Sequence, residues 1–208
     1  MKNSRISKAV FNRLPKYYRI LKKLKAENIS KISSSSLAIK LGLTSSQVRQ
    51  DFSCFGEFGQ QGYGYNVDYL LSEIGEILGL NRIKKLILIG AGDLGSALAS
   101  HFNFESLGFS LIGVFDKKES LIGKMVKNTP VRSISLLDEF CLEQQPDAAM
   151  LCITESGAKE IFEALVKRGV KGFINFTNCE LKSDSEDIFV ENIFLSDSFL
   201  SLSMKYKA

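Results

Sequence analysis

Apolar side chains recur every three or four residues near the start of the chain, which is the period of an α-helix. Pro15 suits the first turn of a helix because its φ is fixed near the helical value. The apolar positions around it are Leu14, Tyr17, Tyr18, Leu21 and Leu24, and Lys or Arg fills most of the positions between them. The pattern predicts a basic amphipathic helix beginning near Pro15.

Two short helices separated by a glycine are predicted next. The serines at 33–36 form a loop and an N-cap for a helix over 37–41, which ends at Gly42. Residues 44–47 fit a capping box and begin a second helix that runs through Phe52. This helix-turn-helix pattern would present polar side chains to a DNA major groove: Ser45, Ser46, Gln47, Arg49 and Gln50. Helical hairpins of this length also occur as plain packing units.

Aromatic residues alternate with glycines over residues 55–65, a pattern that favours two short strands joined by turns. We interpret this hairpin as the wing of a winged helix-turn-helix. Its expected DNA contacts are Gln60, Gln61 and Tyr63. A helix over 67–80 follows. The polar residues after it mark a boundary between a DNA-binding domain over 1–84 and a second domain over 85–208.

Strand and helix patterns alternate in the second domain. Strands are expected over 86–90, 111–116, 148–153, 172–176 and 188–194, and helices over 94–104, 134–144 and 157–168. Such alternation predicts an α/β fold with a doubly wound parallel sheet of the Rossmann type, covered on both faces. A terminal helix over 196–205 is apolar on a wide face, which favours its exchange with a partner subunit.

The first strand of this domain runs directly into Gly90, Gly92 and Gly95, which have the G-x-G-x-x-G spacing of a dinucleotide-binding turn. Asp116 ends the next strand about 20 residues on, where an acidic residue takes a ribose hydroxyl and favours NAD(H) over NADP(H). Alternatively, Asp116 only opens the loop that follows. The candidate cofactor residues are Gly90, Ala91, Gly92, Asp93, Leu94, Gly95, Asp116, Lys117 and Thr154.

Charge and composition narrow the class of protein. Residues 1–85 hold fifteen Lys and Arg against six Asp and Glu, a net charge of +9, whereas residues 86–208 carry twelve against seventeen, a net charge of −5. A basic front half favours a nucleic-acid-binding module, although surface lysines can also serve solubility. The four cysteines are widely spaced beside a single His, so we expect no metal site. With no long apolar run, we expect no membrane span and a cytoplasmic location.

Several motifs together resemble one known family, the Rex redox-sensing transcriptional repressors. The matching segments extend along nearly the whole chain and include 13–19, 47–49, 55–59, 62–65, 90–99, 114–116 and 169–172. The resemblance implies a homodimer with a winged-helix domain, a Rossmann domain and an exchanged terminal helix. It also implies binding to an inverted-repeat operator on double-stranded DNA when NADH is scarce, and release when NADH binds.

The sequence departs from the family pattern at the expected interdomain switch. By this resemblance Arg13, His101 and Phe194 occupy the positions of a polar latch, and His101 replaces a usual Tyr while Phe194 replaces a usual Asp. Because Phe194 cannot accept a hydrogen bond from a guanidinium through its side chain, the latch is expected to be altered. Gln50 and the pair at 60–61 replace usual basic residues, which predicts weaker phosphate binding.

Three functions remain open from the sequence. The first is a DNA-binding repressor regulated by NAD(H). The second is a regulator on the same frame whose coupling to NADH is altered or lost. The third is a small NAD-dependent oxidoreductase, which we rank last because no positioned acid–base pair follows the nucleotide motif; we therefore expect no enzyme activity.

Overall fold

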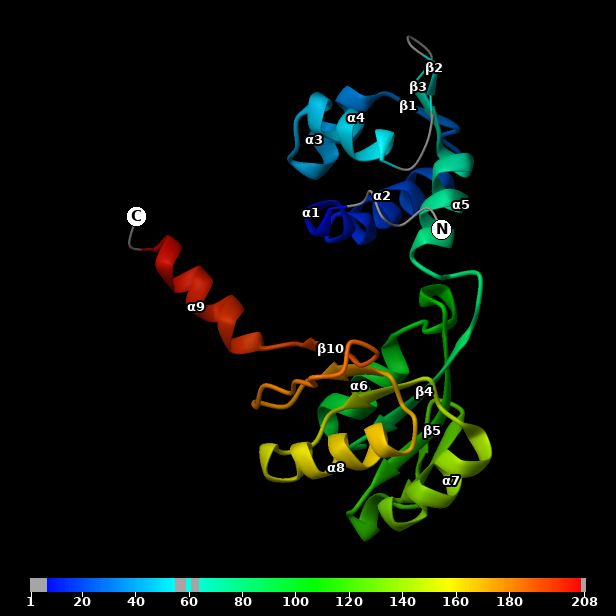
Figure 1. The fold of residues 1–208 in the computed structure, drawn as a ribbon, viewed down its shortest axis with the longest axis vertical. Helices are drawn as coiled ribbons and strands as arrows, with labels where there is room; N and C mark the ends of the chain where they lie inside the picture. Colours follow the sequence, from blue (N-terminus) through cyan, green and yellow to red (C-terminus); the bar gives the residue numbers. More distant parts are fainter. Residues whose placement is uncertain (1–6, 55–58, 61–63, 207–208) are drawn as a thin grey trace. The chain divides into compact units, whose positions relative to one another are not determined.

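The chain divides into two units between Arg82 and Ile83 in the computed structural model, which describes residues 7–54, 59–60 and 64–206 (Figure 1). The boundary predicted from the sequence lies two residues later, after residue 84. Lys84 already begins a strand of the second unit, because its backbone N–H donates to the Gly108 carbonyl.

The first unit is built from short helices around a small sheet. Its elements are α1 (Lys8–Phe11), α2 (Leu14–Ala26), β1 (Lys31–Ile32), α3 (Ser34–Leu41), α4 (Ser45–Ser53), β2 (Gly59–Gln60), β3 (Gly64–Asn66) and α5 (Val67–Ile77). The N-caps expected from the sequence are present, since Ser33 Oγ accepts from Ser36 N at 3.0 Å and Thr44 Oγ1 accepts from Gln47 N at 3.1 Å. Gly42 ends α3 with a left-handed φ of 68°.

Two elements of this unit have no counterpart in the sequence analysis. Helix α1 is a single turn, and β1 pairs antiparallel with β3, so the wing sheet has the order β1-β3-β2 and not two strands. A two-residue strand carries no readable alternation, and only its pairing with residues 65–66 makes it a strand. Buried side chains from α2, α3, α4 and α5 form one core, which holds α4 against α2.

The second unit is a seven-stranded sheet with helices on its faces. Its elements are β4 (Lys84–Ile89), α6 (Asp93–His101), η2 (Glu105–Leu107), β5 (Phe109–Asp116), η3 (Glu119–Leu121), β6 (Met125–Val126), β7 (Thr129–Ser133), η4 (Ile134–Leu136), α7 (Leu137–Gln144), β8 (Ala148–Leu151), α8 (Glu155–Lys167), β9 (Gly172–Asn175), β10 (Phe189–Asn192) and α9 (Leu195–Lys205). The strand order is β10-β9-β8-β4-β5-β7-β6.

The sheet is parallel except at one edge, where β6 pairs antiparallel with β7. The sequence pattern predicts neither strand, because β6 has only two residues and β7 carries a proline, which is disfavoured inside a strand. Central β4 is buried on both faces: Ile87 and Ile89 belong to the core on one face, and Leu86 and Leu88 to the core on the other. The uninterrupted apolar run of β4 therefore reflects its place in a doubly covered sheet.

Helix α9 buries none of its residues in the described structure. Its exposed apolar side chains are Leu195, Phe199, Leu200, Leu202 and Met204, and Phe199 alone exposes 71% of its surface. None of the described helices combines the length and apolar character that a membrane span requires.

Candidate functional site

The three glycines after β4 differ in what surrounds them. Gly90 has a φ of 98°, and a Cβ built on it would lie 2.5 Å from the Cys152 carbonyl oxygen. A Cβ on Gly95 would collide with the Gly90 carbonyl oxygen. By contrast, a Cβ on Gly92 would meet no atom within 4 Å, and the Gly92 backbone angles suit any residue. Packing inside the chain thus accounts for Gly90 and Gly95, whereas the space over Gly92 is open to a group from outside.

That space lies at the N-terminus of α6. Gly92 is the N-cap of this helix and provides no side-chain cap, so the first N–H groups of the helix lack intrahelical partners and present its positive end. The Ser96 hydroxyl donates to the Ala91 carbonyl at 2.7 Å and fixes the turn. Asp93 and Leu94 are exposed in the first turn. Because the Asp93 carboxylate would repel a phosphate, the backbone N–H is the group this residue can offer.

Asp116 ends β5 and contacts the glycine turn directly. Its Oδ2 accepts from the Ala91 N–H at 2.7 Å, and its Oδ1 accepts from the Lys118 N–H at 2.8 Å. The side chain therefore opens the following loop and also braces the turn, and its contact with a ribose hydroxyl stays a prediction. A carboxylate has about four acceptor sites, which leaves capacity for a ribose hydroxyl. Lys117 is exposed beside it.

The sheet topology brings Thr154 to the same edge. From β4 the chain proceeds to β5 and β7 on one side, then crosses to β8 on the other side of β4. Ligands of open α/β sheets bind at the carboxyl ends of the strands where the order reverses. Gly90 follows β4 there, and Thr154 follows β8 as the exposed N-cap of α8, with Oγ1 3.2 Å from Ser156 Oγ. The residues present thus suit the pyrophosphate and ribose of a dinucleotide.

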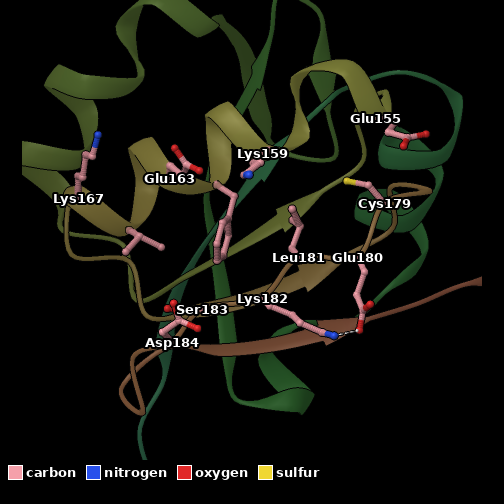
Figure 2. Close-up of a pocket in the computed structure, with 12 residues that line it drawn as sticks. Glu155, Lys159, Glu163, Lys167, Cys179, Glu180, Leu181, Lys182, Ser183 and Asp184 are labelled. Carbon is pink, nitrogen blue, oxygen red and sulfur yellow. Dashed lines mark ion pairs between the residues drawn. The ribbon is translucent and has the colours of Figure 1, made fainter.

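A separate groove of about 680 Å³ runs between α8 and the loop over 179–184 (Figure 2). Its ionisable lining alternates in sign: Glu155, Glu163, Glu180 and Asp184 against Lys159, Lys167 and Lys182. None of the candidate cofactor residues lines this groove. Without a net positive charge it suits a pyrophosphate less well than the α6 terminus does.

The first unit presents α4 to solvent. Ser46, Arg49 and Gln50 are exposed, Ser45 and Gln47 are half-buried, and Val48 faces the core. The Arg49 guanidinium donates to Ser34 Oγ at 3.2 Å and to Ser46 Oγ at 3.3 Å. Gln60 lies in strand β2, whereas Gln61 and Tyr63 fall outside the described residues.

Asp51, a charged residue of α4 that is not among the residues predicted from the sequence to be functional, is only 2% exposed. Arg13 donates to it through two nitrogens, Nε to Oδ2 and Nη2 to Oδ1, both at 2.7 Å, and the Tyr17 hydroxyl donates to Oδ2 at 2.8 Å. The hydrogen bond to Asp51 raises the pKa of Arg13, and burial, reinforced by Asp51, raises the pKa of Tyr17. Partners 38 residues apart leave no local sequence signal.

The three residues of the expected latch are divided between the two units. Arg13 belongs to the first unit, while His101 ends α6 as an exposed residue and Phe194 stands half-buried before α9. Their association stays a prediction.

A winged helix followed by a Rossmann-type unit defines a DNA-binding regulator with a nucleotide-binding fold. A family model described as "Putative DNA-binding protein N-terminus" matches residues 5–53, and one described as "CoA binding domain" matches residues 81–179. The redox-sensing transcriptional repressor Rex of Clostridium novyi (strain NT) is 43% identical over 97% of this chain and 96% of its own length. The Rex of Clostridium kluyveri is 44% identical with the same coverage. The chain therefore belongs to the Rex family of redox-sensing transcriptional repressors, as its motifs predicted.

Solved structures agree with this assignment. The crystal structure of RSP in complex with beta-NAD+ and operator DNA matches with a TM-score of 0.90 at 40% identity, covering 97% of this chain and 92% of that one. RSP in complex with beta-NADH matches with a TM-score of 0.87 at 37% identity, covering 98% and 95%.

Proposed function

We propose that this protein is a transcriptional repressor that senses the NADH/NAD+ ratio, binding an inverted-repeat operator when NADH is low and releasing it when NADH binds. The observation that carries the proposal is the open space over Gly92 at the N-terminus of α6, in a chain that also exposes Arg49 and Gln50 on α4. The structures of RSP with NAD+ and operator DNA, and with NADH, support it.

The cofactor acts as a regulatory ligand, and the residues of the second unit hold it. Backbone N–H groups from Gly92 onward receive the pyrophosphate, because those of Gly90 and Ala91 already donate within the chain. Asp116 receives the ribose hydroxyls, with Lys117 beside it. Thr154, on the other side of the switch point, contacts the second half of the dinucleotide. The protein binds the nicotinamide without transforming it, so we expect no turnover of NADH.

The DNA-binding unit places α4 in the major groove. Its candidate base and phosphate contacts are Ser45, Ser46, Gln47, Arg49 and Gln50, with Gln60, Gln61 and Tyr63 on the wing. A homodimer matches an inverted repeat because both have two-fold symmetry. The bare apolar face of α9 is the surface we assign to exchange between subunits. A repressor acts where the DNA lies, and we place this one in the cytoplasm.

The coupling between the two sites is a population shift. NADH releases DNA only if it binds the DNA-incompetent form more tightly, and operator DNA then weakens NADH binding by the same factor. Arg13, His101 and Phe194 are the proposed interdomain switch. Two observations favour a weaker coupling than a polar latch would give: the Phe194 side chain offers no acceptor, and Arg13 is already paired with Asp51.

Fluorescence anisotropy with a labelled duplex tests the proposal. The duplex is one that the protein selects from a random library, and the salt concentration is held constant because phosphate contacts depend on it. We expect tight binding without cofactor or with NAD+, and weaker binding with NADH. Failure to bind DNA in low salt would overturn the proposal. An affinity for DNA that does not change on adding NADH would favour a regulator with lost coupling. Steady consumption of NADH would favour an enzyme.

A further inference from the structure

The buried carboxylate of Asp51 is the least expected feature of α4. This helix contributes Val48 and Phe52 to the core, and Asp51 lies between them on the buried side. Burying a carboxylate is unfavourable unless it is paired and hydrogen-bonded. Here both oxygens are engaged, one by Arg13 alone and the other by Arg13 and Tyr17.

The geometry of this cluster is directional, whereas the apolar contacts around it are not. A guanidinium that meets a carboxylate through two parallel hydrogen bonds restrains angle as well as distance. The burial of Val48 and Phe52 stabilises α4 on the core, but the hydrophobic effect behind it has no direction, so the ion pair adds an angular restraint of its own. Successive residues of a helix are separated by about 100°, so an orientation imposed at Asp51 also orients its neighbour Gln50.

Arg13 and Tyr17 lie at the start of α2, a helix of the core in which Leu14 and Leu21 are fully buried. The Tyr17 ring also packs on Phe52 with centroids 4.9 Å apart. The start of α2 is therefore an anchored reference point to which α4 is attached.

We propose that Arg13 is a positioning residue for DNA recognition: through Asp51 it fixes the rotation and register of α4, so that Ser46, Arg49 and Gln50 meet base edges in the correct frame. The inference rests on the proposed function, because it concerns the same DNA surface. It adds that Arg13 determines the selectivity of that surface from inside its own unit. Buried ion pairs contribute little net stability compared with apolar replacements, which makes orientation the property this pair supplies.

The decisive variant replaces the whole pair by apolar residues, Arg13→Met with Asp51→Leu. This change leaves no unpaired buried charge, although the buried Tyr17 hydroxyl loses its acceptor, so we expect the unit to fold with a Tm close to that of the wild type. The matched control is Arg168→Met with Asp138→Leu, which removes another two-bond pair (3.0 and 2.6 Å) from the second unit. Two single variants weaken the cluster in steps. Arg13→Lys keeps the charge but loses the two parallel hydrogen bonds of the guanidinium, and Tyr17→Phe removes one hydrogen bond to Asp51.

The measurement is the ratio of affinities for two duplexes, the one that the wild type selects from a random library and a scrambled duplex of the same composition. Misorienting α4 loses base contacts while keeping the basic surface, so affinity for the selected duplex should fall about tenfold or more. Affinity for the scrambled duplex and the dependence on salt should stay as in the wild type. The control pair should leave the ratio unchanged.

The affinity ratios of the variants and of the wild type distinguish a failure of this inference from a failure of the proposed function. A ratio equal to that of the wild type in the apolar double variant overturns the inference. If circular dichroism shows that this variant is unfolded, Arg13→Lys and Tyr17→Phe decide: a graded loss of ratio at unchanged Tm supports the inference, and an unchanged ratio overturns it. A wild type that selects no sequence overturns the proposed function instead, which separates the two failures.

Discussion

Replacing Gly92 and Gly95 in turn by alanine separates ligand contact from packing within one motif. At Gly92 the backbone is compatible with alanine and the Cβ meets nothing within 4 Å. Reduced freedom of the unfolded chain contributes about 0.4–1 kcal/mol of stability, and the poorer N-cap costs a similar amount. The two effects offset, so we expect the Tm of Gly92→Ala to lie within about 2 °C of the wild type.

At Gly95 the new Cβ would collide with the backbone oxygen of Gly90, which cannot move aside without shifting the turn. Such overpacking costs about 1–3 kcal/mol or more, and the better helix propensity of alanine returns about 1 kcal/mol. At the upper end of that cost the net loss is about 2 kcal/mol, so we expect Gly95→Ala to lower the Tm by roughly 4–8 °C. Gly75→Ala, in α5 of the other unit with ordinary contacts at 3.5 Å, is the control that should leave NADH binding unchanged.

Calorimetric titration with NADH completes the comparison. A Cβ on Gly92 would stand between the backbone and the pyrophosphate and remove at least one hydrogen bond to a charged group. That loss is worth about 1.5–3 kcal/mol, or about 10- to 100-fold in affinity. A stable Gly92→Ala protein that binds NADH as tightly as the wild type would refute our placement of the pyrophosphate. A Gly95→Ala protein with an unchanged Tm would refute the packing argument.

Three further predictions concern charge, pH and assembly. Asp116→Asn should reduce the ratio of affinities for NADH and NADPH by about tenfold, because the 2′-phosphate of NADPH no longer faces a carboxylate. Competition binding with both nucleotides measures this ratio, and an unchanged ratio would count against the ribose contact. Burial raises the pKa of the Cys152 thiol from 9.0 to about 12. The folded chain thus keeps a proton that the unfolded chain loses above pH 9. The free energy of unfolding should therefore fall by up to about 1.4 kcal/mol per pH unit as the pH rises from 9 toward 12. Urea titrations at successive pH values would show this fall, which should be less steep in Cys152→Ala. Phe199 and Leu200 expose 71% and 65% of their surface. Replacing both by serine should convert a dimer to a monomer, as measured by light scattering. A dimer that persists would place the interface elsewhere.

The sequence by itself determined the features that depend on neighbouring residues. Ser33 and Thr44 cap helices, Gly42 ends one, and the apolar run of β4 leads into the glycine turn as its spacing predicted. Caps, turns and periodicity act over a few residues, so they are readable from the chain alone. The family resemblance could be recognised for the same reason, since its motifs are short and contiguous.

Tertiary structure decided what depends on residues distant in the chain. Strands β1, β6 and β7 exist only through their pairing partners. Asp51 resembles any surface acid of a helix until folding brings Arg13 and Tyr17 to it. The glycine motif already predicts that Gly92 lets the backbone approach phosphates and that Gly95 lets the helix pack closely, but the atoms that a Cβ on Gly95 would meet, the Gly90 carbonyl among them, are known only from the packed turn. A residue's type is local information, but whether its charge is paired or its Cβ has room is a property of the packed chain.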